Sequence, residues 1–375
     1  MDKNDMLREL MEIMGTDAVS GSEEGVAARL APALEELGFH VSMDSAGESF
    51  GGRCGNIFAY RDGELPGAVL FSAHMDRVPN GFGIKPVVRD GKLFSDGTTI
   101  LAADDVSGTC AVLNGLRALL SEKDAALPRL EVMFSVGEET GLRGAKAFDL
   151  SRSRADVCFV FDSSGHTGRI ITAAPGMYFI TGKIRGRSAH AGIAPETGAD
   201  AADAMCKMLG TARKGRLSAT ATSNFPYLTT LEPPINAVCS YAEFRGEARS
   251  RAAGELAEYL EYFRRHCEET AAACGVELEL TMTAASEAFS IAPDDPILAI
   301  CREACAAVGA PFSPEAGGGG LDANVYNAKG LKSVGIATGY FKNHSTEEYQ
   351  ILDEFYKAGE LAAALVKAYI RSRGA

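Results

Sequence analysis

The stretch GMYFITGKIRGRSAHAG, residues 176–192, decides how the chain is organised. Its apolar and polar residues alternate in the way that is typical of a strand with one exposed face. Upstream of this stretch, short apolar runs alternate with helical segments instead. The change in pattern predicts that a domain of a different kind begins near residue 176.

Downstream of that strand, the segment to residue 290 continues as a helix, two strands, a long amphipathic helix and a further strand. This β-α-β-β-α-β order is the split, ferredoxin-like pattern. From APDDPILAICREACAAVG onward, the alternation of helices and strands resumes and runs to residue 375. We therefore expect an α+β domain over residues 176–290, inserted into another domain.

The remaining residues, 1–175 and 291–375, are expected to form one discontinuous α/β domain. The apolar runs NIFAY, AVLFSAHMD and RLEVMFSV alternate with segments of helical spacing. That alternation predicts a mixed sheet with some parallel strands buried on both faces. A length of 375 residues suits two domains better than one.

Composition excludes several classes of partner. A formal net charge of -13 offers no positive field for nucleic acid. No apolar run approaches the roughly 20 residues that a membrane helix needs, and the first residues lack the apolar region of a secretory signal. The nine cysteines include no CxxC pair, which favours reduced thiols. We expect a cytoplasmic protein without membrane or nucleic-acid partners.

A histidine and an aspartate stand two positions apart in FSAHMDRVPN, residues 71–80. On an extended segment, His74 and Asp76 lie on the same side. The carboxylate can then accept the second imidazole N–H of a metal-binding histidine. Alone, such a pair is more often an ordinary polar strand end, so its meaning depends on further ligands elsewhere.

Two pairs of adjacent carboxylates occupy similar places. Asp104 and Asp105 stand between an apolar run and a helix start in SDGTTILAADDVSG, where they could be N-caps. Glu138 and Glu139 follow an apolar run in SVGEETGLRGA, where the usual interpretation is a pair stabilised by the helix dipole. Like charges side by side are costly, however, and a divalent cation relieves that cost.

Two single residues complete the pattern. Asp162 ends the apolar run of VCFVFDSSG and could be a turn residue, while His344 in TGYFKNHSTEEY is a lone histidine. Each observation is weak by itself. Together they supply the Asp, Glu and His ligands that paired metal ions need, with one carboxylate left over to handle protons.

The motifs AHMDRV, DGTTILAADDVSG, SVGEETGLRGA, DSSG, RSAHAGIAPE and NHSTEEY occur in this order between about residues 70 and 350. In them the chain resembles the peptidase T-like co-catalytic zinc metallopeptidases. Aminoacylases, glutamate carboxypeptidases and succinyl-diaminopimelate desuccinylase are related members. The resemblance implies a mixed-sheet catalytic zinc-peptidase domain, into which a ferredoxin-like lid and dimerisation domain is inserted.

The resemblance also implies two zinc ions per subunit. His74 and Asp162 would hold one ion, Glu139 and His344 would hold the other, and Asp104 would bridge them. The same ligand types accept manganese or cobalt. The native metal therefore stays open.

Further roles follow from the same resemblance. Asp104 is preferred to Asp105 as the bridge because it aligns with the aspartate of relatives that have only one, and the peptide bond between them is cis in relatives. Asp76 would orient His74. Glu138 would take a proton from a hydroxide-forming water that bridges the zinc ions, and would return it to the leaving amine.

The inserted domain would supply the other site residues. The resemblance implies that His190 donates to the oxyanion, often at the partner subunit's site; an exposed hairpin histidine is the alternative. Arg249 and Asn236 are candidates for binding the substrate carboxylate or backbone. Arg245 or Arg251 could serve in place of Arg249.

The favoured function is a metal-dependent exopeptidase for short peptides, a peptidase T-like aminopeptidase of the tripeptidase type. The alternative is an amidohydrolase or carboxypeptidase acting on N-acyl amino acids, since one metal centre serves both and the motifs do not reach the specificity pocket. From another class, a non-catalytic metal- or peptide-binding protein is considered. A homodimer through the inserted domain is expected from the resemblance.

Overall fold

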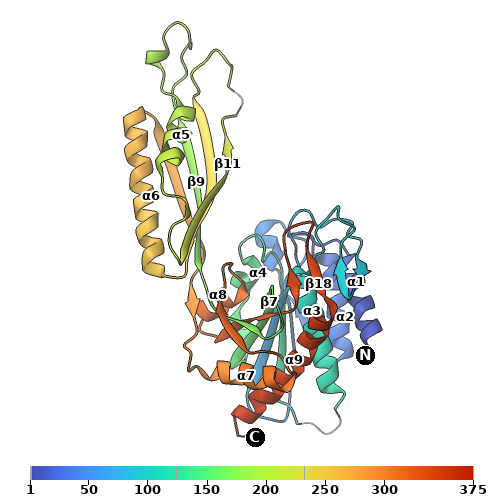
Figure 1. Ribbon diagram of the computed structural model, residues 1–375. Coiled ribbons are helices and arrows are strands. Elements are labelled where there is room, and N and C mark those ends of the chain that lie inside the picture. Colours follow the sequence, from blue (N-terminus) through green and yellow to red (C-terminus); the bar gives the residue numbers. More distant parts are fainter. Residues whose placement is uncertain (1, 123–125, 232, 375) are drawn as a thin grey trace. The chain divides into compact units, whose positions relative to one another are not determined.

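The computed structural model describes residues 2–122, 126–231 and 233–374. The chain divides into two compact units (Figure 1). Unit 1 consists of residues 1–174 and 290–375, and unit 2 of residues 175–289. Each junction lies one residue before the position expected from the sequence.

The large sheet has nine strands and mixed direction. Its order from one edge is β1 (His40–Met43), β2 (Ile57–Arg61), β6 (Arg129–Ser135), β3 (Ala68–His74), β7 (Val157–Ser163), β16 (Ser333–Ala337), β8 (Arg169–Ala174) and β14 (Phe289–Ser290), with β15 (Ser313–Ala316) beside β8. The central strands β6, β3, β7 and β16 run parallel, whereas β2 and β8 pair antiparallel with their inner neighbours. All seven residues of β3 are buried, as a strand covered on both faces requires.

Helices lie on both sides of this sheet. They are α1 (Lys3–Met14), α2 (Glu24–Glu36), α3 (Ala103–Leu120), α4 (Arg143–Ala147), α7 (Pro296–Ala307), α8 (Asp322–Ala328) and α9 (Leu352–Ser372). Figure 1 shows α3 and α9 on one side of β7 and α8 on the other. Gly108 permits the close approach of α3 to β7, because a Cβ there would lie 2.0 Å from the carbonyl oxygen of Phe161.

A second, four-stranded sheet belongs to the same unit. Its order is β17 (Tyr340–Phe341), β18 (Tyr349–Ile351), β5 (Lys92–Phe94) and β4 (Val87–Arg89). The turn between β17 and β18, residues 342–348, carries His344. Both Lys342 and His344 have positive φ angles, of 57° and 62°. The sheet therefore presents this histidine on a tightly bent turn.

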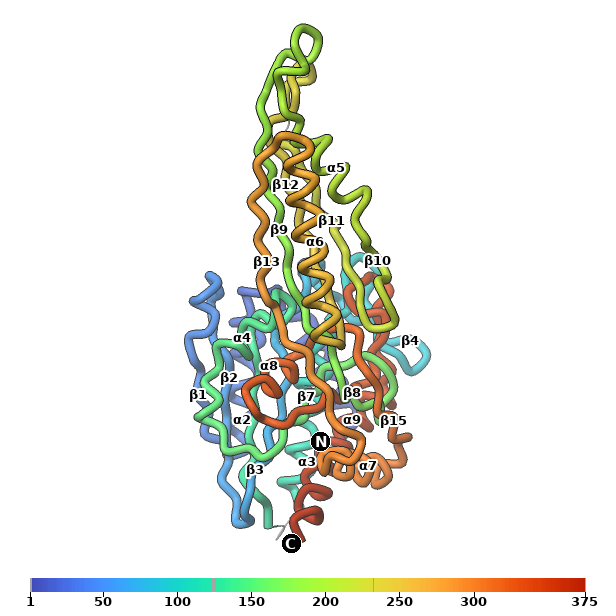
Figure 2. The backbone as a smooth tube through the Cα atoms, turned by 90° about the vertical axis from the view of Figure 1, so that its left-hand side faces the viewer, coloured from blue at the N-terminus to red at the C-terminus, as the bar shows by residue number. Residues whose placement is uncertain are grey.

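Unit 2 has the expected β-α-β-β-α-β order. Its elements are β9 (Gly176–Arg185), α5 (Ala201–Thr211), a short additional strand β10 (Gly215–Arg216), β11 (Ala221–Thr229), β12 (Tyr241–Ser250), α6 (Ala253–Cys274) and β13 (Glu277–Ser286). The strands pair antiparallel in the order β10-β11-β12-β9-β13, and Figure 2 shows β13, β9, β12 and β11 next to one another with α6 across them. Ile180, Ile184 and Phe244 from the sheet and Phe263 from α6 form part of one buried core. The predicted fold class, a mixed α/β fold with an inserted α+β unit, is confirmed.

Two further observations relate to composition. All nine cysteines are free, and Cys110, Cys158 and Cys301 are among the buried ones. Among the described residues, no helix is both long enough and apolar enough to cross a membrane.

Candidate metal centre

The first ligand set consists of His74, Asp104 and Asp162. His74 is the last residue of β3, Asp104 lies in the first turn of α3, and Asp162 lies near the end of β7. The His74 Nε2 atom is 3.1 Å from Asp104 Oδ1 and 3.8 Å from Asp162 Oδ1. Residues that are 30 and 88 positions apart from His74 thus meet at one ring nitrogen.

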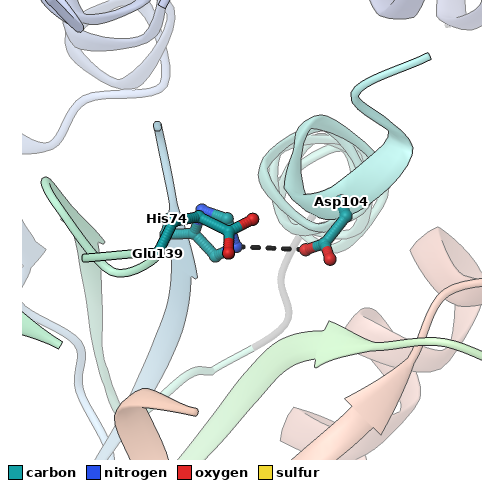
Figure 3. A group of neighbouring side chains, drawn as sticks. All are labelled: His74, Asp104 and Glu139. Atoms are coloured by element: carbon teal, nitrogen blue, oxygen red, sulfur yellow. Dashed lines mark hydrogen bonds and ion pairs between the residues drawn. The ribbon is translucent and has the colours of Figure 1, made fainter. Parts of the chain in front are cut away.

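The second ligand set consists of Asp104, Glu139 and His344. Glu139 follows β6 after a short turn, and His344 comes from the turn after β17. The His344 Nε2 atom is 3.0 Å from Glu139 Oε1 and 3.3 Å from Asp104 Oδ2. Asp104 therefore presents one carboxylate oxygen to each set, and Figure 3 shows it facing His74 and Glu139.

These distances fit divalent metal ions. In a tetrahedral zinc site with ligands about 2.0–2.2 Å from the ion, neighbouring ligand atoms stand about 3.3–3.6 Å apart. The four contacts just described range from 3.0 to 3.8 Å. Imidazole and carboxylate donors without thiolate suit zinc, manganese or cobalt. The residues present can hold a pair of such ions.

The pKa shifts of the residues in this cluster also indicate that it binds divalent cations. Burial, together with the charges of Asp104 and other carboxylates, raises the pKa of Asp162 to about 8. Burial and the charges of Asp162 and Glu139 raise the pKa of Glu138 well above its ordinary value. Burial would lower the pKa of His74, but hydrogen bonds with Asp104 raise it. Crowded carboxylates of this kind are stabilised by a divalent cation.

Asp105 is arranged differently from Asp104, although it also lies within reach of His74 and Asp162. Asp105 Oδ2 accepts from the backbone N–H of His74 at 3.1 Å, and Oδ1 accepts from the N–H of Gly108 at 3.2 Å. The peptide bond between the two aspartates is cis, as the resemblance implies. Of the two aspartates, Asp104 has oxygens within 3.3 Å of the ring nitrogens of both His74 and His344, so it has the geometry of a bridging ligand.

Asp76 contacts both the ring of His74 and the loop that carries Glu138. The His74 Nδ1 atom is 2.9 Å from the backbone carbonyl oxygen of Asp76 and 3.4 Å from its carboxylate, so the carbonyl is the nearer partner. The carboxylate accepts from the N–H groups of Glu138 at 2.9 Å and Glu139 at 3.2 Å, and from the Ser20 hydroxyl at 2.5 Å. Asp76 thus links the end of β3 to the loop after β6.

Glu138 is placed for proton transfer. It follows Gly137, whose φ of 61° turns the chain sharply at the end of β6. The side chain is buried, and within the described residues its carboxylate makes no hydrogen bond or ion pair. A carboxylate without a fixed partner is available to accept and return a proton.

Several residues that sequence reasoning missed contact the ligands. The Tyr340 hydroxyl donates to Asp162 Oδ1 at 3.3 Å, and Asn343 Nδ2 donates to Asp104 Oδ2 at 2.7 Å. Glu348 accepts from the backbone N–H groups of Leu101, Ala102 and Asp104. Asn343 and Glu348 both lie with His344 in the motif NHSTEEY, and this was the signal that could have found them; Tyr340 lies outside that motif.

His190 and Asn236 come together within unit 2. The backbone of His190 pairs with that of Ala237, and the N–H of Ala191 donates to the carbonyl oxygen of Asn236 at 2.9 Å. The side chains of His190 and Asn236 are both exposed. The two residues therefore share one end of this unit.

Arg249 does not join them within this unit. It pairs with Met177 at the start of β9, whereas His190 lies beyond Arg185 at the other end of that strand. The eight residue-to-residue steps from Met177 to Arg185 span about 26 Å in a strand. Glu247 binds the Arg249 guanidinium through two hydrogen bonds of 2.8 and 2.7 Å.

The other candidate arginines are also engaged. Arg245 Nε donates to Glu243 at 2.6 Å, and Arg251 donates to the carbonyl oxygen of Ala219 at 3.3 Å. A substrate carboxylate would have to compete with Glu243 for Arg245, as it would with Glu247 for Arg249. The geometry of unit 2 thus singles out none of the three arginines.

Comparison with known proteins gives one consistent result. Residues 70–368 match the sequence profile of peptidase family M20/M25/M40. The chain is 32% identical to the uncharacterized protein YqjE of Bacillus subtilis (strain 168), over 96% of this chain and 97% of that protein. It superposes on aminopeptidase PepT from Bacillus cereus ATCC 10987 with a TM-score of 0.88 and 31% identity, over 99% of both chains. A tripeptidase from Staphylococcus aureus subsp. aureus Mu50 gives a TM-score of 0.91 and 27% identity, over 100% of this chain and 99% of that one.

Proposed function

The chain belongs to peptidase family M20/M25/M40 and is a metallopeptidase, and from this premise we propose that it is an aminopeptidase of the tripeptidase type that acts on short peptides. The predicted resemblance is thereby confirmed at the level of the family. We further propose that two zinc ions occupy the two ligand sets, with Asp104 as the shared ligand. Manganese or cobalt would satisfy the same donors.

One observation carries the proposal: an unpaired, buried Glu138 stands beside two ligand sets that share the Asp104 carboxylate. A protein that only stored metal or bound peptide would have no use for a free carboxylate in a cluster already crowded with negative charge. Burying a carboxylate that has no hydrogen-bond or ion-pair partner costs free energy. The arrangement therefore favours catalysis over binding alone.

In the proposed hydrolysis, different residues of the chain have different roles. The two ligand sets would hold divalent ions, which when bound would supply Lewis acidity to lower the pKa of water and polarise the scissile carbonyl. Glu138 accepts a proton from the attacking water and returns it to the leaving amine. Asp76 keeps Glu138 and Glu139 at their places through their backbone N–H groups. Water attack and amine departure then occur beside one carboxylate.

Unit 2 would complete the reaction. In this proposal His190 donates a hydrogen bond to the developing oxyanion, at the site of the partner subunit in a homodimer formed through unit 2. Asn236, at the same end of the unit, and Arg249 bind the backbone or carboxylate of the peptide. The exposure of His190 and Asn236 supports a role that reaches beyond their own unit.

Similarity to two solved structures favours an aminopeptidase over an amidohydrolase. The solved aminopeptidase PepT and the tripeptidase named above match nearly the whole chain at 31% and 27% identity. An aminopeptidase requires a free α-amine on its substrate, whereas an amidohydrolase requires an acylated one. Acylation of the substrate is therefore the variable that separates these functions.

The test is hydrolysis of a peptide panel by the full chain, stripped of metal by a chelator and then resupplied with zinc. The panel contains free di- and tripeptides, their N-acetylated forms and several N-acyl amino acids, and the Glu138→Ala variant is the control. We expect cleavage of free tripeptides that requires metal and disappears in the variant. Turnover of acylated substrates alone would show an amidohydrolase, and metal binding without any turnover would show a binding protein.

A further inference from the structure

Glu348 is a buried carboxylate that the mechanism above does not use. It lies at the end of the turn between β17 and β18 and is 1% exposed. Its Oε2 atom accepts from the N–H groups of Leu101 at 2.8 Å and Ala102 at 3.0 Å, and its Oε1 atom accepts from the N–H of Asp104 at 3.1 Å. Both oxygens thus serve the segment that carries the shared ligand.

That segment needs such an acceptor. Helix α3 begins at Ala103, but Asp104 and Asp105 have non-helical backbone angles, and Ala102 has a positive φ of 61°. The first N–H groups of a helix have no partner inside it, and leaving them unpaired when buried is costly. The Glu348 carboxylate accepts from three of the backbone N–H groups of this segment, so they are paired. Glu348 therefore stabilises an irregular backbone conformation rather than an ordinary helix start.

The same turn reaches Asp104 in two other ways. Asn343 donates to Asp104 Oδ2 at 2.7 Å, and His344 Nε2 lies 3.3 Å from that oxygen. Glu348 contacts the backbone of Asp104, whereas Asn343 and His344 contact its carboxylate. One turn thus controls both the position of Asp104 and the direction of its side chain.

We propose that Glu348 is a positioning residue for the metal centre: by holding the backbone of Asp104 against the turn that carries His344, it sets the affinity of the second ligand set. The inference rests on the proposed metal-dependent function. The first ligand set depends less on this contact, because its other members, His74 and Asp162, come from strands β3 and β7 of the large sheet.

A purely structural role makes a different prediction. If Glu348 only capped the start of α3, its loss would lower the stability of the fold, while each folded molecule would bind both ions as tightly as before. If it positions Asp104, the affinity for one ion of the two falls in molecules that remain folded. Metal affinity, measured separately from stability, distinguishes the two roles.

The turn offers a matched control. Glu347 is adjacent, and its exposed side chain pairs with Lys342 at 2.8 Å. The variants are Glu348→Gln and Glu347→Gln, which remove the same charge one residue apart. In Glu348→Gln one acceptor oxygen becomes an amide donor that faces backbone N–H groups. Glu348→Asp keeps the charge but shortens its reach, and serves where Glu348→Gln fails to fold.

The measurement is competitive titration of the stripped full chain with zinc and a chromophoric chelator, with a melting curve of each metal-free variant. We expect Glu348→Gln and Glu348→Asp to bind one ion about 10–100-fold more weakly than the wild type, in the range found for groups that support metal ligands, and the other ion with a smaller loss of affinity. Glu347→Gln should bind both ions as the wild type does.

Two results would overturn the inference in distinguishable ways. Wild-type affinity for both ions in the Glu348 variants contradicts the positioning role and leaves the proposed function standing. A wild-type chain that binds no zinc contradicts the proposed function, and this inference with it. Equal weakening in the Glu347→Gln control also contradicts the inference, because charge near the turn, and not the contact with Asp104, would then be responsible.

Discussion

In unit 1 the carboxylates of Asp104, Glu138 and Asp162 share one cluster with little solvent exposure, whereas in unit 2 those of Glu243, also buried, and Glu247, half-buried, lie beside arginines. Burial and neighbouring negative charge raise the pKa of Asp162 to about 8. No lysine or arginine side chain among the described residues pairs with any of these three carboxylates of unit 1.

The pairs of unit 2 are formed two residues apart on the same strand. Arg245 lies 2.6 Å from Glu243, and Arg249 lies 2.7 Å from Glu247. The Arg245 side chain is exposed, and an ion pair that solvent reaches in this way contributes about 0–1 kcal/mol to stability. Buried carboxylates that have no lysine or arginine partner need an external cation, whereas carboxylates paired with an arginine do not. The difference between the units therefore indicates which carboxylates are candidate metal ligands.

The largest effect is expected from Glu138→Gln. The amide cannot accept the proton, so kcat should fall by about 10²–10⁴-fold, the usual contribution of a general acid–base group. The zinc content should stay at two ions per chain, because Glu138 is in neither ligand set. Steady-state kinetics and metal analysis check this, with Glu279→Gln of unit 2, paired with Lys183 at 3.7 Å, as control. Loss of metal in the Glu138 variant would instead make this residue a ligand.

The next effect concerns unit 2. His190→Ala should lower kcat by about 10²–10³-fold, as removal of one oxyanion donor does, while zinc affinity is unchanged. His266 is a second histidine of the unit, whose Nε2 lies 3.0 Å from the carbonyl oxygen of Met208. His266→Ala should leave kcat alone. Equal kcat in His190→Ala and the wild type would show that unit 2 gives no oxyanion donor.

Metal removal should change hydrogen exchange in unit 1 but not in unit 2. Zinc at about 100 times its Kd stabilises the state that binds it by about 2.7 kcal/mol. Because the ions would lie at the ends of β3 and β7, the amides of these strands should exchange more slowly with zinc than without it. Those of β12 in unit 2 should not change. Hydrogen exchange followed by mass spectrometry measures this. Equal protection of both units by zinc would contradict the assignment of the metal ions to unit 1.

The smallest effect tests whether Arg249 is held away from substrate. If it binds the peptide carboxylate, Arg249→Ala should raise KM severalfold at constant kcat, and Glu247→Gln should lower KM by freeing the guanidinium. The change is small because the competing pair contributes only about 0–1 kcal/mol. Kinetics on a free tripeptide decide, with Arg245→Ala as control. A rise in KM in Arg245→Ala alone would transfer the role to that arginine.

The fold was predictable where local patterns determine it. The continuous apolar run of β3 indicates a strand buried on both faces, and all its residues are buried. The alternation in residues 176–192 indicates the first strand of unit 2. Strand order was not predictable in the same way: β6 lies between β2 and β3 because of packing between distant segments, which no local periodicity encodes.

For the site, residue type and position at strand ends indicated the carboxylates and histidines that the structure brings together. The supporting contacts were not predictable, because they join distant segments. Glu347 and Glu348 are neighbours with the same side chain, yet one is exposed and the other is buried against the backbone of Asp104, 244 residues away. The carboxylate of Asp76 likewise serves the loop of Glu138, and only the folded chain shows this.

The proposed two-ion centre would depend on Asp104 as its shared ligand. Crystals of the zinc-loaded chain, measured by anomalous diffraction at the zinc absorption edge, test it directly. We expect two peaks about 3.5–4 Å apart, as in other two-metal sites, with one Asp104 oxygen bound to each. A single peak, or two peaks of which only one contacts Asp104, would contradict the shared-ligand centre.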